Sequence, residues 1–199
     1  MYFVEVIAPE DFFTDDTEEA IGLVGSRVVG PTIADDIKTG AVYSIIFSLI
    51  VVFLYILVRF RKWQFSLGAV VALVHDVLFV MGIFSLLDGV LPFQLEVDQA
   101  FIAAILTVIG YSLNDTVVVF DRIRENMGSR KANFLDGVNK SLNQTLSRTF
   151  NTSVTTFFVL LVIFLFGGEV IRGFMFALLL GVLVGTYSSL LIATPVRID

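Results

Sequence analysis

The sequence predicts an all-α membrane protein with five transmembrane helices. Of its 199 residues, 56% are hydrophobic and only 16% are charged, which is far from the composition of a soluble domain. Five windows carry few or no charges and are long enough to span, because about 20 helical residues cross a hydrocarbon core of about 30 Å. Within lipid every backbone amide must be paired internally, which favours helices. We place the spanning helices at about 39–58, 63–87, 99–120, 149–168 and 173–196.

The basic residues predict the orientation of these helices, since short loops rich in Lys and Arg tend to stay in the cytoplasm. Arg59, Arg61 and Lys62 follow the first helix, and six more basic residues lie between positions 121 and 148. The connection 88–98 contains no basic residue. We therefore expect a multi-pass protein with its two basic connections and its C-terminus in the cytoplasm and its N-terminal segment outside.

Residues 1–38 differ in composition from the transmembrane domain, 39–199. Between Glu10 and Glu19 six of ten residues are acidic, and 25–31 resembles a short strand that ends at a Gly-Pro turn. So few apolar side chains can hardly bury a core of their own. The segment is either a solvated tail or, as we favour, an extracytoplasmic remnant at the end of a truncated periplasmic domain.

The connection between the third and fourth spanning helices is predicted to contain a cytoplasmic amphipathic helix at about 133–147. Leu135, Val138, Leu142 and Leu146 recur every three or four residues and would share one face. We expect this helix to pack under its own bundle, with docking of a partner as the alternative.

Asp115 is the only charged residue in the third predicted span. A charge near the middle of the bilayer costs about 2.5 to 3.5 kcal/mol on insertion scales, so such a group usually faces a polar pathway. At about 100° per residue, Asp115 shares a stripe with Asn114 and Asp121. Arg148 and Asn151 lie on a comparable face of the next span. We predict that Asp115 and Arg148 handle ions or protons; a static salt bridge between two helices is the alternative.

His75 and Asp76 form a second polar position, in the second span. Adjacent residues diverge by about 100° around a helix, so we do not expect this pair to act as a His–carboxylate relay within its own helix. Either residue could support the ion pathway, or neighbouring helices could simply satisfy the pair. Gly181 and Gly185 in the last span predict close helix packing.

Several kinds of chemistry are excluded or disfavoured. The chain has no cysteine and one histidine, so it cannot form disulfides, thiolate metal sites or a His-rich metal centre. It has no Gly-rich loop with Lys-Ser/Thr, and no arrangement of a nucleophile, a histidine and an acid is evident. Its basic residues belong to membrane loops, which argues against a nucleic-acid surface. We therefore expect no enzyme activity and no cofactor, with a gradient or a partner supplying the energy.

Two stretches carry a resemblance to a known family: GYSLNDTVVVFDRIREN at 110–126 and NKSLNQTLSRT at 139–149. Both resemble the SecF family of bacterial protein-export membrane proteins, which belongs with SecD to the resistance-nodulation-division superfamily. Similar stretches are RFRKWQFSLGAVVALVHDV at 59–77, FGGEVIRGF at 166–174 and GTYSS at 185–189. The similarity extends over roughly 28–196.

The resemblance implies a subunit of the bacterial inner membrane that is driven by the proton gradient. It would work with SecD, the SecYEG translocon, SecA and YidC on preproteins, in contact with membrane lipid. It assigns Asp115 and Arg148 to the proton pathway, with Asn114 as the neighbour of the acid. The five spans would form most of one half-bundle, and the family's first helix and most of its periplasmic domain lie outside this sequence. Two alternatives are a proton-coupled exporter of small solutes from the same superfamily and a passive scaffold for the translocon.

Overall fold

The described residues of the chain, 31–127 and 134–195 in this computed structural model, form five α-helices. They are α1 (Pro31–Phe60), α2 (Trp63–Leu87), α3 (Gln99–Met127), α4 (Phe134–Phe166) and α5 (Glu169–Leu191). All five are long and apolar enough to cross a membrane, which confirms the predicted fold class. Of the predicted N-terminal segment 1–38, residues 1–30, which include the predicted strand up to its last residue, lie outside the described residues, and 31–38 belong to α1.

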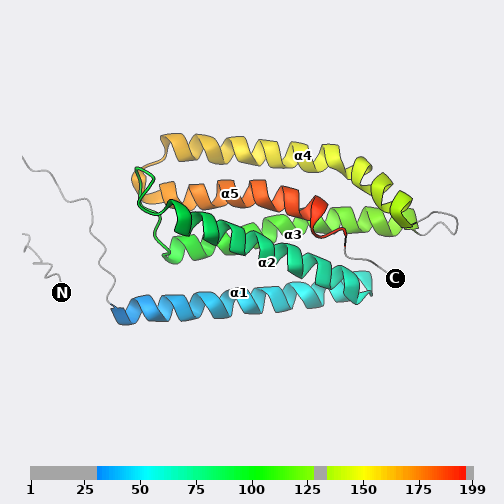
Figure 1. Cartoon of the computed structure of the whole chain (residues 1–199), viewed down its shortest axis with the longest axis horizontal. Helices are drawn as coiled ribbons and strands as arrows, with labels where there is room; N and C mark the ends of the chain where they lie inside the picture. The colour runs from blue at the N-terminus through cyan, green and yellow to red at the C-terminus, as the bar shows by residue number, and fades with distance from the viewer. Residues whose placement is uncertain (1–30, 128–133, 196–199) are drawn as a thin grey trace, which may run out of the picture.

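The helices run side by side and alternate in direction, so that every second connection lies at the same end of the bundle (Figure 1). The turn between α1 and α2, with Arg59 and Lys62, lies at the same end of the bundle as the C-terminal end of α3 and the N-terminal end of α4 (Figure 1). Helix α5 contacts α2, α3 and α4, whereas α1 contacts only α2 and α3. The centre of the bundle is therefore the contact between α3 and α5, and α1 lies at its edge.

Two glycines allow α5 to approach α3 closely. A Cβ atom at Gly181 would lie 2.8 Å from Cγ1 and 2.9 Å from Cβ of Val108, and closer still to Cγ2. A Cβ atom at Gly185 would lie 3.0 Å from Cβ of Ser112. The small residues thus lie where the backbones of two spanning helices meet, which is the packing that small residues permit in membranes.

In helix α4 the predicted amphipathic helix and the fourth predicted span form one continuous helix. The sequence contains no Gly or Pro from Val138 to Phe166, so nothing interrupts the backbone hydrogen bonds between the two parts. Val138 and Leu142 pack against the core, but Leu135 and Leu146 are exposed. Within the described part of the chain, only two of the four side chains of the predicted apolar face therefore pack against the bundle.

Helices α1 and α3 also extend beyond the predicted spans, to Pro31 and to Met127. The reason is that hydropathy marks the part of a helix that lies in lipid, whereas backbone hydrogen bonds can continue into water. In α3 this extension carries Asp121 and Arg122 on the same rigid helix as Asp115. Charged residues at the basic end of the bundle are thereby fixed relative to the intramembrane acid.

Candidate functional site

Asp115 lies inside the bundle on α3. The residue is 5% exposed, and its Oδ2 has no hydrogen-bond partner within the described part of the chain. It belongs to the buried stripe of α3 that includes Val108 and Ser112, the residues that face the two glycines of α5. Residues three or four positions apart share a helix face, so this stripe places the carboxyl toward the bundle interior.

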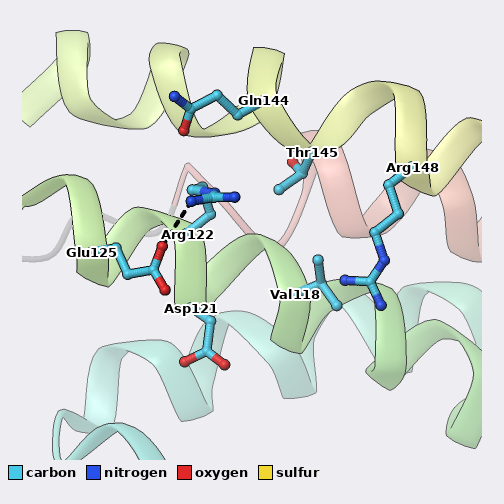
Figure 2. A pocket seen from close by; sticks show the side chains of 7 residues that line it. All are labelled: Val118, Asp121, Arg122, Glu125, Gln144, Thr145 and Arg148. Carbon is cyan, nitrogen blue, oxygen red and sulfur yellow. Dashed lines mark hydrogen bonds and ion pairs between the residues drawn. The ribbon is translucent and has the colours of Figure 1, made fainter.

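A pocket of about 200 Å³ lies between α3 and α4 at the basic end of the bundle. Its lining residues are mostly polar or charged: Val118, Asp121, Arg122, Glu125, Gln144, Thr145 and Arg148. Arg148 extends from α4 toward α3 and ends beside Val118, which follows Asp115 by one turn (Figure 2). The guanidinium of Arg148 therefore lies in the pocket, close to the part of α3 that carries Asp115.

Asp115 and Arg148, the predicted pair, are neighbours without being bonded. No ion pair or hydrogen bond joins the two side chains in the described part of the chain, although Arg148 is near enough to interact electrostatically with the carboxyl. The guanidinium of Arg148 has no partner among the described residues, and the side chain is exposed. The described residues therefore do not contain the static salt bridge between Asp115 and Arg148 that was the alternative interpretation of the sequence.

Asp121 has a different environment from Asp115, although the sequence placed both on one stripe. Its two carboxylate oxygens accept hydrogen bonds from Nη2 of Arg59 at 3.0 and 2.9 Å, and Arg124 lies 3.4 Å away. Asp121 points away from Arg148 (Figure 2). The guanidinium groups of Arg59 and Arg124 lie over the ring of Phe60, with their Cζ atoms 5.3 and 5.6 Å from the ring centroid. Asp121 thus fixes the end of α1 to α3.

Replacement of Asp121 with Asn should destabilise the bundle by about 1 kcal/mol, because it removes a two-oxygen ion pair that is only partly screened by water. The loss should shrink at high salt. Thermal unfolding in detergent at two salt concentrations measures both effects. Glu125→Gln is the matched control, since it breaks an exposed pair with Arg122 on the same helix and should cost less than about 0.5 kcal/mol. Equal losses in the two variants would contradict this assignment.

Asn114 and Asn151 are exposed, unlike Asp115. The structure thus separates Asn114 from the acid beside it, because neighbours on a helix point about 100° apart. On α4 the exposure extends over the whole predicted polar face: Gln144, Arg148, Asn151, Thr152 and Thr155. Thr152 and Thr155 hydrogen-bond to carbonyls of their own helix. A polar face at membrane depth needs protein or water beside it, because lipid cannot satisfy it.

His75 and Asp76 are in contact, contrary to the expectation that adjacent positions keep them apart. Nδ1 of His75 lies 3.3 Å from Oδ1 of Asp76, because the side chains lean toward each other from neighbouring positions. Asp76 is fully buried and accepts hydrogen bonds at Oδ2 from Ser112 of α3 at 2.6 Å and from Ser188 of α5 at 2.8 Å. One carboxyl therefore links three helices.

Sequence reasoning missed Ser112 as a polar residue of this site. It also assigned no polar contact to Ser188 in the last span. The available indication was spacing, since Ser112 precedes Asp115 by one turn and Ser188 follows Gly185 by three residues. Serine is too common in spanning helices for spacing alone to identify its partner. The described residues contain no group of three or more His, Cys, Asp or Glu side chains that could hold a metal ion.

Known proteins resemble the chain over most of its length. A family model described as "Protein export membrane protein SecD/SecF, C-terminal" matches residues 12–199. SecF of Rhodothermus marinus is 60% identical over 178 residues, which are 89% of this chain and 58% of the relative. SecF of Vibrio alginolyticus is 46% identical over 185 residues, 92% of this chain and 56% of the relative. The chain thus spans little more than half the length of these relatives.

Solved structures agree with the sequence comparison. SecDF of Thermus thermophilus, described as a translocon-associated membrane protein, superposes with a TM-score of 0.73 at 42% identity. The match covers 84% of this chain and 22% of that one. A crystal structure of SecDF in a super-membrane-facing form matches with the same TM-score at 40% identity, over 86% of this chain and 22% of that one. The chain therefore belongs to the SecD/SecF family of protein-export membrane proteins.

Proposed function

We propose that the chain forms part of a SecF subunit that works with SecD and uses the proton-motive force to assist preprotein translocation across the bacterial inner membrane. Family membership supports this proposal, since the relatives are named protein translocase subunits. In this proposal the subunit transports rather than catalyses, and the proton gradient takes the place of a cofactor.

Asp115 provides the observation that carries the proposal. It is a carboxyl 5% exposed within a spanning helix, with one oxygen unpaired in the described part of the chain. Thr116 and Thr149 also carry buried hydroxyls without a described partner. Each unsatisfied buried polar group costs about 1–3 kcal/mol, so a purely structural bundle would have little reason to keep such groups. A pathway that admits water or protons accounts for their presence.

The mechanism that we propose is a charge-pair switch between α3 and α4. When Asp115 is ionised it attracts the guanidinium of Arg148, which has no other described partner and lies beside the pocket. When a proton binds Asp115, the carboxyl becomes neutral, the attraction weakens and the helices shift relative to each other. One charge crossing the membrane potential supplies about 2.3 kcal/mol per 100 mV, enough to bias a motion of a few kcal/mol.

The exposed polar face of α4 supports a second half-bundle as partner. Asn151 and its polar neighbours on α4 are exposed at membrane depth, where another protein would need to cover them. In this proposal SecD covers that face and contributes further polar groups, as parallel repeats do in related transporters. The basic turn after α1 lies at the same end of the bundle as the C-terminal end of α3 and the N-terminal end of α4, and this end would lie in the cytoplasm (Figure 1). SecYEG, SecA and YidC would be reached through the assembled complex.

Arg148→Gln tests the proposal in membrane vesicles that contain the complete complex. We expect export driven by the proton-motive force to fall about tenfold, because the neutral side chain no longer distinguishes the two charge states of Asp115. Lys140→Gln is the matched control: it removes a positive charge from an exposed position on the same helix, outside the pocket lining, and export should be unchanged.

Three outcomes would contradict the proposal. Unchanged export in Arg148→Gln would favour a passive scaffold, for which intramembrane charge is unimportant. An equal loss in Lys140→Gln would mean that general charge, and not the position of the guanidinium, is what matters. Proton uptake that depends on an added small solute and not on a preprotein would favour the small-solute exporter.

A further inference from the structure

A second ionisable pair, His75 and Asp76, lies where α2, α3 and α5 meet, and the charge-pair switch does not use it. The Asp76 side chain is 0% exposed and that of His75 is 32% exposed. The imidazole ring of His75 also packs near two aromatic rings: its centroid lies 5.9 Å from that of Phe79 and 5.8 Å from that of Tyr187 on α5. The imidazole thus lies at the edge of the bundle while its carboxyl neighbour lies within it.

The burial of Asp76 restricts the charge that the pair can carry. An isolated charge in a low-dielectric interior is costly, and the hydroxyls of Ser112 and Ser188 offer dipoles but no neutralising charge. In the part of the chain that the structure describes, His75 is the only basic group in contact with Asp76. The pair is electrically neutral when it holds one proton, either as imidazolium with carboxylate or as imidazole with carboxylic acid.

We propose that His75 and Asp76 together form a second proton-binding site in the membrane interior, separate from Asp115. The shared proton passes between Nδ1 of His75 and Oδ1 of Asp76 across their 3.3 Å contact. When imidazolium gives this proton to the carboxylate, both charges disappear together and no other reactant is needed. Oδ2 remains the acceptor for the two serines in both states.

This site is coupled to the helix that carries Asp115. Ser112 bonds to Asp76 and precedes Asp115 by one turn on the buried stripe of α3, and Ser188 bonds to the same oxygen from α5. A carboxylate accepts hydrogen bonds about twice as strongly as a neutral acid, so the position of the proton changes how firmly α2 holds the other two helices.

The other ionisable groups near the pair are few. Helix α5 contributes Tyr187 beside the imidazole, and α3 contributes Asp115 one turn from Ser112. No described residue of α1 makes a hydrogen bond or ion pair with either member of the pair. The proton balance of the site therefore depends on His75 and Asp76 themselves, with Asp115 as the nearest acid on α3.

The test uses the single histidine of the chain. The chain is labelled with ¹⁵N-histidine and ¹³C-aspartate in lipid nanodiscs, and NMR follows both labels between about pH 4 and pH 10. The Asp76 carboxyl is assigned by its absence in Asp76→Asn. We expect the imidazole and this carboxyl to respond over one common pH interval, as a coupled pair that shares a proton must. Separate intervals, or no response of either group, would overturn the proposal.

Two adjacent serines provide a matched pair of variants. Ser188 bonds to Asp76, whereas the equally buried Ser189 bonds to the carbonyl of Thr186. Ser188→Ala should move the common interval to higher pH by about one pH unit, because the lost hydrogen bond is stronger to the carboxylate than to the neutral acid, and Ser189→Ala should leave the interval in place. Identical behaviour of the two variants would contradict the assigned coupling.

The same titration in Asp115→Asn separates this proposal from the proposed function. We expect the His75–Asp76 interval to persist in that variant, since the pair holds its proton without Asp115. Persistence supports a separate site whether or not export depends on Asp115. Disappearance of the response would show that the pair is not a site of its own.

Discussion

Asp115→Asn should reduce proton-driven export by about tenfold or more, the largest functional effect that we expect from a single substitution. Asn has nearly the same size and shape as Asp, so the buried stripe of α3 should keep its packing, but its amide does not switch between a charged and a neutral form at physiological pH as a carboxyl can. The charge that attracts Arg148 is then permanently absent. Export of a preprotein and proton flux in vesicles of the complete complex measure the two consequences.

The matched control makes the same chemical change outside the membrane. Glu96→Gln replaces an exposed carboxylate in the connection between α2 and α3, and both export and proton flux should be unaffected. Normal export together with normal flux in Asp115→Asn would refute the switch. Reduced export with normal flux would also refute it, because the carboxyl would then affect the bundle without carrying protons.

Gly181→Ala should destabilise the bundle by about 1–3 kcal/mol, as overpacking of a filled interior does. The new methyl group would overlap the side chain of Val108, which is 1% exposed and held between α3 and its neighbours. The two helices would have to separate at the contact that forms the centre of the bundle. Thermal unfolding of the purified chain in detergent measures the loss.

Alanine substitutions at two other glycines provide a comparison for the loss expected at Gly181. A Cβ atom at Gly185 would lie 3.0 Å from Cβ of Ser112, a tighter distance than usual that a small shift relieves, so Gly185→Ala should cost less than Gly181→Ala. Gly82 on α2 has nothing within 4 Å of the position of a new Cβ, and Gly82→Ala should be neutral or slightly stabilising. A larger loss at Gly82 than at Gly181 would contradict the packing described for α3 and α5.

The polar residues show where prediction from the sequence reached its limit. The composition of the third span made Asp115 conspicuous, because one charge among apolar residues is costly wherever the helix lies. The same rule could not separate Asp121, which is paired with Arg59, from Asp115, which has an unpaired oxygen in the described part of the chain. Helical periodicity gives a direction around one axis, but the partner of a side chain depends on which helix lies in that direction.

The sequence by itself determined the number of spanning helices and which acids and glycines lie within them, since these follow from local hydropathy and helix geometry. Only the tertiary structure decided that Arg148 lies near Asp115 without bonding to it, and that Asp76 joins three helices through Ser112 and Ser188. The physical reason is that insertion into lipid depends on the composition of each segment separately. Hydrogen bonds between helices depend on rotation and spacing, which are set by how the whole bundle packs.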